Sequence, residues 1–316
     1  MSDKKIIAVV GATGAQGGGL VRAIVADKGG PFVARAITRT TSSDKAKALA
    51  ALGVEVVAGD ADDEKSMEKA FRGAYGAFCV TNFWEHMSPD REIAQATALA
   101  KAAKAAGVQH AIWSTLEDSR KFIPLSDDRM PTLGGRWKVP HFDAKGEADQ
   151  AFRDAGVPTT FLLTSFYWDN LVFFGMGPRK TDDGTYGFVL PMGDRKLPGI
   201  AAEDIGAAAL NIFKAGKEYI GKTIGIAGEH LSGAEMAAQL SQALGKDVRH
   251  QAVPPAVYRT FGFPGADDMG NMFQFNHDFA DAFRAARDVG FSRRLNPSLQ
   301  TFSQWLARNK QKIPLE

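Results

Sequence analysis

The glycine-rich stretch VVGATGAQGGGLVRA near the N-terminus has the residue types and spacing to hold a diphosphate. Gly11, Gly14 and Gly17 stand three residues apart. In such a loop the first glycine permits a tight turn, the second lets the backbone approach a pyrophosphate, and the third lets a helix pack closely on a strand. The amides at the start of that helix attract the phosphates. The spacing therefore predicts dinucleotide binding, and the alternative is a glycine turn that holds no ligand.

The residue after the second predicted strand selects between the two nicotinamide coenzymes. A carboxylate there favours NAD because it accepts a hydrogen bond from the ribose 2′-hydroxyl, whereas arginine favours NADP because it neutralises a 2′-phosphate. The stretch ITRTTSSDK supplies Arg39 and contains no acid before Asp44. We therefore predict NADP(H) as the cofactor, with Arg39 on the 2′-phosphate. The alternative is a solvated surface arginine.

The ends of two further strands complete the predicted coenzyme site. Asp60 and Ala61 follow the third strand, where an adenine edge would lie. The alternative for Asp60 is that it caps the next helix. Thr81, Asn82 and Phe83 follow the fourth strand, on the side expected for the nicotinamide. The alternative for Asn82 is a turn residue.

The stretch VPHFDAKGE places His141 and Lys145 four residues apart, on one face of a predicted helix. An imidazole with an ordinary pKa of about 6.5 is a competent proton donor near neutrality, although a neighbouring ammonium lowers that pKa. Tyr167, in TSFYWDN, follows the sixth strand and is a second candidate donor facing the nicotinamide. Phe166, Tyr167 and Trp168 could equally form a hydrophobic cluster under the C-terminal part.

The composition is that of an ordinary globular protein, with 316 residues of which 45% are hydrophobic and 23% charged. The formal net charge of +2 is too small to indicate direct binding of nucleic acid or of a membrane surface. The single cysteine, Cys79, fits a reducing compartment, and no apolar run is long enough to span a bilayer. We therefore expect a cytoplasmic protein. The histidine spacing gives no reason to expect a metal.

Strand-like and helix-like patterns alternate in the first half of the chain. This alternation predicts an α/β fold, a Rossmann-type doubly wound parallel sheet followed by a smaller α+β C-terminal part. We place the NADP-binding domain at residues 1–165, with the sheet open to completion by later strands, and the C-terminal substrate or partner part at 166–316. A hairpin is expected around 182–188 and a long loop at 119–138, of the kind that forms lids or binds partners. The strands are predicted at 5–11, 32–39, 54–60, 76–82, 110–116 and 159–166.

The motifs GATGAQGGG, VTNFWE, STLED, VPHFDAKGE and LNPSLQTFSQWL together resemble the NmrA-like family, an atypical branch of the short-chain dehydrogenase/reductase superfamily. The resemblance covers essentially the whole chain. It implies a Rossmann-type sheet, NADP in preference to NAD and, for several members, regulation of other proteins rather than turnover. It also implies phosphate contacts at Thr13, Gly14, Ala15 and Gln16, a 2′-phosphate contact at Arg39, and nicotinamide-side contacts at Thr81, Asn82, Lys145 and residues 165–170.

The ordinary reductases of this superfamily carry a tyrosine where this chain has His141. Their tyrosine gives a proton to the carbonyl oxygen as hydride arrives, and a lysine four residues later lowers its pKa. Three hypotheses follow. Lys145 binds the coenzyme and no chemistry follows, or His141 is the acid, or another residue donates the proton. Candidates for that third role are Tyr167 and, after the fifth strand, Ser114 and Thr115.

The missing tyrosine leads to an NADP(H)-binding redox sensor or regulator as the predicted function, with a protein partner. The alternative is an NADPH-dependent reductase of a small quinone, carbonyl or imine substrate. We expect a monomer or a homodimer. The two functions differ in whether NADPH is consumed.

Overall fold

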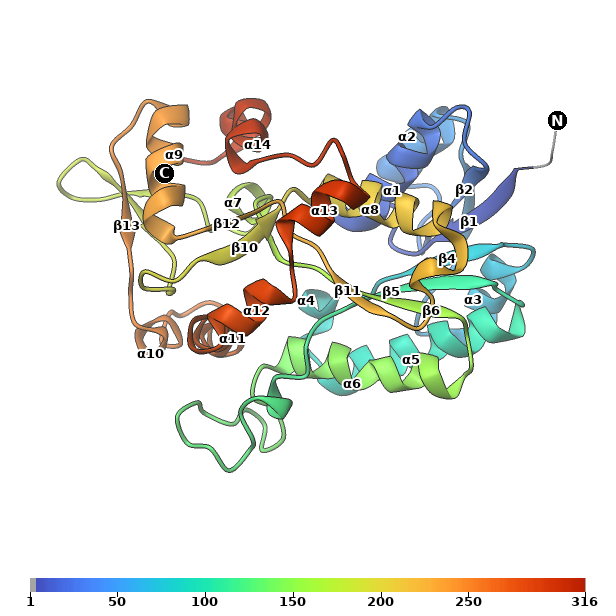
Figure 1. Ribbon diagram of the computed structural model, residues 1–316, viewed down its shortest axis with the longest axis horizontal. Coiled ribbons are helices and arrows are strands. Elements are labelled where there is room, and N and C mark those ends of the chain that lie inside the picture. The colour runs from blue at the N-terminus through green and yellow to red at the C-terminus, as the bar shows by residue number, and fades with distance from the viewer. Residues whose placement is uncertain (1–3, 316) are drawn as a thin grey trace. The chain divides into compact units, whose positions relative to one another are not determined.

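The computed structural model describes residues 4–315 and divides into two compact units (Figure 1). Unit 1 comprises Met1–Asp118, His141–Thr164 and Glu203–Ile224. Unit 2 comprises Ser119–Pro140, Ser165–Ala202 and Gly225–Glu316. The chain therefore passes between the units several times, whereas the sequence analysis places one boundary after residue 165.

A seven-stranded sheet forms the centre of unit 1, in the order β11-β6-β5-β4-β1-β2-β3. The pairings among β1 to β6 are parallel, which confirms the predicted doubly wound sheet. A later strand, β11, completes the sheet beside β6. The strand order reverses at β1, which pairs with both β2 and β4, and ligands of such sheets bind at this switch point. The strands are β1 (Lys5–Val9), β2 (Phe32–Thr38), β3 (Glu55–Ala58), β4 (Gly76–Cys79), β5 (His110–Thr115), β6 (Thr159–Leu163) and β11 (Thr223–Gly225).

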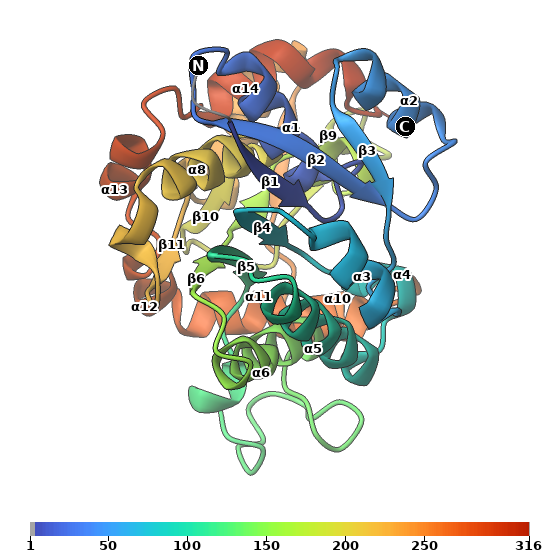
Figure 2. The same cartoon turned by 90° about the vertical axis from the view of Figure 1, so that its right-hand side faces the viewer.

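Helices cover both faces of this sheet, and Figure 2 shows α3, α5 and α6 below it and α1 and α8 above it. On one face, Phe71, Leu99 and Phe152 pack with Trp113 of β5 in one buried core. Burial on both faces explains why a central strand such as β4 is buried at successive residues, without the alternation of a half-exposed strand. The helices of unit 1 are α1 (Ala15–Ala26), α2 (Asp44–Ala51), α3 (Glu64–Phe71), α4 (Phe83–His86), α5 (Pro89–Ala105), α6 (Pro140–Asp154) and α8 (Ala202–Lys214) with the short η2 (Gly216–Tyr219).

Helices α1 and α8 approach each other through glycines. A Cβ on Gly206 of α8 would lie 2.1 Å from the backbone nitrogen of Leu20. A Cβ on Gly19 of α1 would lie 3.0 Å from the Cα of Glu203. Only glycine fits such a backbone-to-backbone approach, so the run GGG at residues 17–19 serves packing as well as phosphate access.

Unit 2 is built on two three-stranded sheets, with strand orders β12-β10-β7 and β13-β9-β8. The hairpin expected around 182–188 is confirmed as the antiparallel pair β8–β9. The helices and strands of unit 2 are η1 (Ser119–Lys121), β7 (Phe166–Tyr167), α7 (Asn170–Phe173), β8 (Arg179–Lys180), β9 (Tyr186–Val189), β10 (Leu197–Ile200), β12 (Glu229–Leu231), α9 (Gly233–Leu244), β13 (Val248–Gln251), α10 (Pro255–Tyr258), α11 (Ala266–Asp278), α12 (Ala280–Ala285), α13 (Val289–Leu295), α14 (Phe302–Asn309) and η3 (Lys310–Lys312).

The long loop after β5 is attached to α11 within unit 2. The Asn271 side chain donates to the carbonyl oxygens of Pro131 and Lys138, at 2.9 and 2.6 Å. The buried Lys138 ammonium in turn donates to the carbonyls of Asp127 and Met130. These bonds satisfy loop carbonyls that burial would otherwise leave unpaired.

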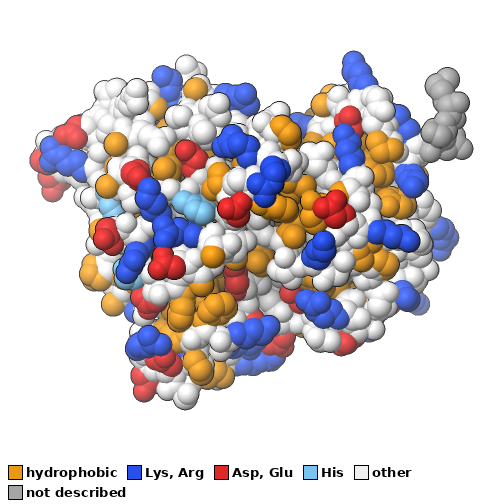
Figure 3. Space-filling model, in the orientation of Figure 1, with side chains coloured by type: hydrophobic (Ala, Val, Ile, Leu, Met, Phe, Trp, Pro, Cys, Tyr) orange, Lys and Arg blue, Asp and Glu red, His pale blue; other side chains and the backbone are white. Residues whose placement is uncertain are grey.

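The surface carries both signs of charge. On the face that Figure 3 displays, Lys and Arg side chains are interspersed with Asp and Glu. This agrees with the small net charge and gives no single basic surface on that face. Among the helices formed by residues 4–315, none has the length and apolar character needed to cross a bilayer.

Candidate dinucleotide site

The glycine loop of unit 1 has the geometry of a phosphate cradle. Gly11 adopts φ +64°, and the Gly14 amide donates to its carbonyl at 2.8 Å. Gly14 is the N-cap of α1 and has no side chain with which to cap the helix amides. A Cβ on Gly17 would lie 2.5 Å from the carbonyl oxygen of Gly11. The exposed loop thus presents the first-turn amides of α1, which have no acceptor inside the helix, around Thr13, Ala15 and Gln16.

Arg39, at the end of β2, forms a two-point ion pair with Glu85 of α4. Its Nη2 donates to Oε2 at 3.0 Å, and Nη1 donates to the second oxygen. Both side chains are substantially exposed, at 55% and 42%. Arg39 is therefore not surrounded by solvent alone, which is the alternative to a role in binding. The guanidinium is therefore accessible from solvent but already holds a carboxylate, and its contact with a 2′-phosphate stays a prediction.

Arg39 and Asp60 line one cavity of 720 Å³ in unit 1. Asp60 follows β3 and accepts the amide of Asp62 at 3.0 Å. The alternative that Asp60 caps the following helix is wrong, because the N-cap of α3 is Asp63, which accepts from two first-turn amides. The neighbouring Ala61 is half-buried and is not part of that lining. The cavity thus has the Arg39 guanidinium and the Asp60 carboxylate in one lining, and the adenine contact of Asp60 stays a prediction.

Lys145 of α6 is held by a buried carboxylate that the sequence analysis does not select. Its ammonium lies 2.6 Å from Oε1 of Glu92, whose side chain is fully buried in the first turn of α5. It also donates to the hydroxyl and the carbonyl of Thr81, at 2.8 and 3.2 Å. The three N–H donors of the ammonium thus face three acceptors. A ribose hydroxyl at this place would have to replace one of them.

His86 lies on the other side of Glu92 from Lys145. Its Nδ1 accepts the amide of Ser88 at 3.1 Å, which places the ring proton on Nε2. That Nε2 lies 3.4 Å from the second oxygen of Glu92. Glu92 therefore holds Lys145 of α6 and lies next to His86 at the end of α4.

His141 lies in an aromatic cluster rather than beside an open cavity. His141 is only 5% exposed. The imidazole centroid is 4.8 Å from Trp84, 5.8 Å from Phe83 and 4.8 Å from Phe142. Phe83 itself is buried, while Asn82 is exposed as the N-cap of α4 without a side-chain cap bond. These surroundings favour packing as the role of His141 over proton donation.

Two hydroxyls at the end of β5 have partners inside unit 1. The Ser114 hydroxyl donates to Oε1 of Gln16 in the glycine loop at 2.8 Å. The Thr115 hydroxyl lies 2.6 Å from Asp149 of α6. The Ser114 hydroxyl therefore connects β5 to the glycine loop, and the Thr115 hydroxyl connects β5 to α6.

Phe166 and Tyr167 belong to unit 2, where they form strand β7 and pair with β10. Both are half-buried. Their neighbour Trp168 is buried against Phe302 and Trp305, so the predicted hydrophobic cluster exists around Trp168. The phenol is thus carried by the short strand that precedes this core.

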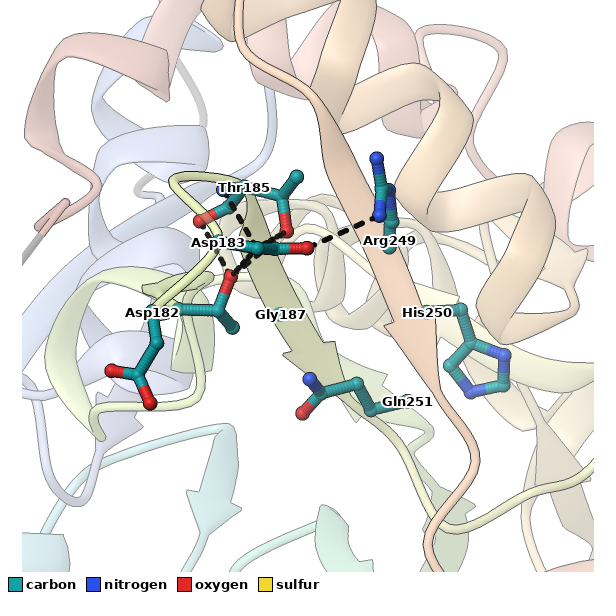
Figure 4. A pocket seen from close by; sticks show the side chains of 8 residues that line it. Asp182, Asp183, Thr185, Gly187, Arg249, His250 and Gln251 are labelled. Carbon is teal, nitrogen blue, oxygen red and sulfur yellow. Dashed lines mark hydrogen bonds and ion pairs between the residues drawn. The ribbon is translucent and has the colours of Figure 1, made fainter.

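A second cavity, of 480 Å³, opens beside the β8–β9 hairpin of unit 2 (Figure 4). Asp183 accepts from the hydroxyls of Thr181 and Thr185 and from the Thr185 amide. These bonds, with Arg249 at 3.4 Å, hold the pKa of its carboxyl well below its usual range. One oxygen accepts all three bonds of the turn and the other faces Arg249, so Asp183 organises the hairpin.

Sequence reasoning missed Glu85 and Glu92, the two carboxylates that hold the predicted cations. One pattern could have identified Glu92. It stands in register with the buried stripe of α5, at positions 92, 96, 99 and 103. An acid in an apolar stripe requires a buried cation. Glu85 offers no comparable pattern, because α4 is only four residues long.

Comparisons with known proteins place the chain in a family. The sequence profile of the NmrA-like family matches residues 3–306. The chain is 34% identical over 250 residues to an NAD(P)H azoreductase of Xenophilus azovorans, covering 78% of this chain and 77% of the relative. It is 29% identical over 291 residues to the NmrA-like family domain-containing oxidoreductase FrzB of Cladobotryum sp, covering 85% and 83%.

Among solved structures, the chain is similar to NmrA, a negative transcriptional regulator, in its complex with NADP. The TM-score is 0.77 at 26% identity, and the match covers 97% of this chain and 95% of that chain. The same protein in complex with NAD matches with the same TM-score.

Proposed function

The chain belongs to the NmrA-like family, and on this premise we propose that it binds NADP(H) through unit 1 and acts as a redox sensor or regulator. The observation that carries the proposal is the environment of the two residues four apart on α6. The Lys145 ammonium is occupied by Glu92 and Thr81, and His141 is packed among aromatic rings. Unit 1 thus has a frame for a dinucleotide in which His141 is buried and Lys145 is already paired.

Coenzyme binding is supported by the glycine loop and by the solved complexes of NmrA with NADP and with NAD. In the proposed mode, the amides of Thr13, Gly14, Ala15 and Gln16 hold the diphosphate. Asp60 and Ala61 flank the adenine, and Thr81, Asn82 and Phe83 lie toward the nicotinamide end. When bound, the coenzyme supplies a hydride or accepts one, and the protein distinguishes its forms by unequal affinity in two conformations.

The preference for the phosphorylated coenzyme is assigned to Arg39. We expect Arg39→Ala to weaken NADPH binding by about 1.5–3 kcal/mol, the range for a hydrogen bond to a charged group, and to change NADH binding far less. Isothermal titration calorimetry measures both. Arg249→Ala is a matched control, because Arg249 is 59% exposed and also paired with acids. Equal losses for the two coenzymes would defeat the assignment.

The regulatory role is tested by separating binding from turnover. We expect NADPH and NADP⁺ to raise the melting temperature of the protein, because both bind the folded state, while NADPH absorbance at 340 nm stays constant with quinones, aldehydes and imines. Sustained oxidation with any of these substrates would contradict a purely regulatory protein.

A second candidate function is an NADPH-dependent reductase of a small quinone, carbonyl or imine. It is favoured by the 34% identity to an NAD(P)H azoreductase. In this alternative Tyr167 would be the proton donor, and the bound coenzyme would supply the hydride. Tyr167→Phe should then abolish turnover while NADPH affinity is kept. A variant that still turns over would exclude Tyr167 as the donor.

A further inference from the structure

Helix α4, at Phe83–His86, is connected to three separate parts of unit 1 although it contains only one turn. Glu85 contacts Arg39 at the end of β2. Trp84 packs on His141 of α6, and His86 lies beside Glu92 of α5. The helix ends at Met87, which has φ +51°, a conformation that a side chain disfavours. So short an element depends on these contacts for its position.

The pair between Arg39 and Glu85 is the most exposed of these connections. Hydrogen bonding to Arg39 lowers the pKa of the Glu85 carboxyl, and the same bond raises the pKa of Arg39, so both groups stay charged at neutral pH. Asp60 and Asp62 also face Arg39, while Arg91 and His86 face Glu85. Exposed ion pairs contribute little to stability because water and salt screen them. Another anion can therefore replace the carboxylate at small cost.

A phosphate monoester is a stronger partner for a guanidinium than a carboxylate. It offers three acceptor oxygens and close to two negative charges near neutrality, and the arginine fork matches it with two parallel bonds. The ribose 2′-phosphate distinguishes NADP(H) from NAD(H), so only the phosphorylated coenzyme competes for Arg39. A coenzyme without that group leaves the ion pair intact.

We propose that Glu85 is an internal competitor for the 2′-phosphate, which NADP(H) displaces from Arg39, and that this displacement releases α4. The proposal rests on the proposed coenzyme function. It makes Glu85 a specificity-determining residue that lowers affinity for the phosphorylated coenzyme alone. It also gives the protein a way to distinguish NADP(H) from NAD(H) by the position of a helix.

The end of α4 lies next to the buried charges of Glu92 and Lys145. His86 lies at the end of α4, with its Nε2 3.4 Å from Glu92, and Glu92 holds Lys145 at 2.6 Å. A shift of α4 thus changes the position of the imidazole next to the Glu92 carboxylate. An event at the adenosine end of the site is in this way transmitted to the lysine expected at the nicotinamide end.

The competition is tested with two small probes, 2′,5′-ADP and 5′-AMP, which differ by the 2′-phosphate. We expect Glu85→Gln to tighten binding of 2′,5′-ADP and NADPH by about three- to fivefold, the upper part of the range for an exposed ion pair, because the carboxylate no longer competes for the guanidinium. Affinity for 5′-AMP and NADH should stay within twofold. Unchanged or weaker binding of 2′,5′-ADP by the variant overturns the proposal.

Two further variants make the result specific to this pair. In the Arg39→Ala background, Glu85→Gln should no longer change 2′,5′-ADP affinity, because the shared partner is gone. Asp247→Asn removes another exposed carboxylate that pairs with an arginine, here Arg249, and should leave all four affinities unchanged. If the wild-type protein binds neither NADPH nor NADH, the proposed function fails as well; if it binds NADPH and Glu85→Gln does not tighten it, only this inference fails.

The release of α4 has its own readout, the fluorescence of Trp84. We expect 2′,5′-ADP to change the tryptophan emission and 5′-AMP to leave it unchanged at equal occupancy. The difference should disappear in Trp84→Phe. If saturating 2′,5′-ADP gives the wild-type protein and Trp84→Phe the same change, α4 does not move and this part of the proposal is overturned.

Discussion

At the scale of single residues, charge pairing is the feature that organises unit 1. Glu92 has no exposed surface, so its carboxylate is tolerated only because Lys145 and Thr81 supply partners. Arg39 and Glu85, by contrast, are exposed and contribute little to folding. The buried pair of Glu92 and Lys145 holds α5 and α6 together, whereas the exposed pair of Arg39 and Glu85 can exchange partners.

The buried pair leads to a prediction on stability. Lys145→Met should lower the free energy of unfolding by about 3–5 kcal/mol, because it leaves the Glu92 carboxylate buried without its cation. Glu92→Gln should cost less, since Thr81 still accepts from the ammonium. Urea denaturation measures both. The double variant should lose less than the sum, and Lys104→Met, on the exposed side of α5, should stay within about 0.5 kcal/mol of wild type.

At the scale of elements, the position of α1 depends on the backbone of α8. The glycine loop ends in α1, and the close approach at Gly19 and Gly206 fixes how α1 lies in unit 1. Segment Glu203–Ile224 is distant from the loop in sequence but belongs to the same unit. A residue of α8 therefore takes part in orienting the amides proposed to bind phosphate.

This packing gives a prediction for α8. Gly206→Ala should destabilise the protein by about 1–3 kcal/mol, despite the better helix propensity of alanine, because the new methyl would overlap the backbone of α1. Thermal denaturation should show a lower Tm. Gly29→Ala is the matched control, since a Cβ there meets nothing within 4 Å. Equal melting temperatures for the two variants would mean that α1 and α8 can separate without cost.

At the scale of the whole molecule, stability should depend on pH through a buried histidine. His110 lies in β5, fully buried, with Nε2 2.9 Å from the hydroxyl of Thr160. Burial lowers the pKa of His110 to about 4. The unfolded chain takes up a proton near pH 6.5, while the folded chain resists it until near pH 4. Folding stability is therefore lost as pH falls through this window.

The expected slope from His110 is up to about 1.4 kcal/mol per pH unit between these values. Denaturant titrations from pH 7 to pH 4.5 measure it for the whole chain. In His110→Gln the slope should be shallower by that amount. Thr160→Val removes the hydrogen-bond partner but keeps the imidazole, so it should lower stability while retaining the slope. An identical slope in wild type and His110→Gln would show that His110 protonates alike in both states.

The sequence by itself determined the alternating strands and helices, the glycine loop and the family, because these depend on local chemistry: apolar period, helix caps and glycine spacing. Gly53 and Gly107, for example, end helices with positive φ as their positions predict. The sequence also selected Arg39 and Lys145 as the cations of the site.

Only the tertiary structure decided what those cations touch. Glu85 and Glu92 are distant from Arg39 and Lys145 in sequence, and the return of the chain at 203–224 to unit 1 brings α8 against α1. Partners across elements are set by packing, which leaves little trace in a local pattern. His141 is the clearest case: its type permits proton transfer, but the rings of Phe83 and Trp84 around it favour a place in the packing of α4 against α6.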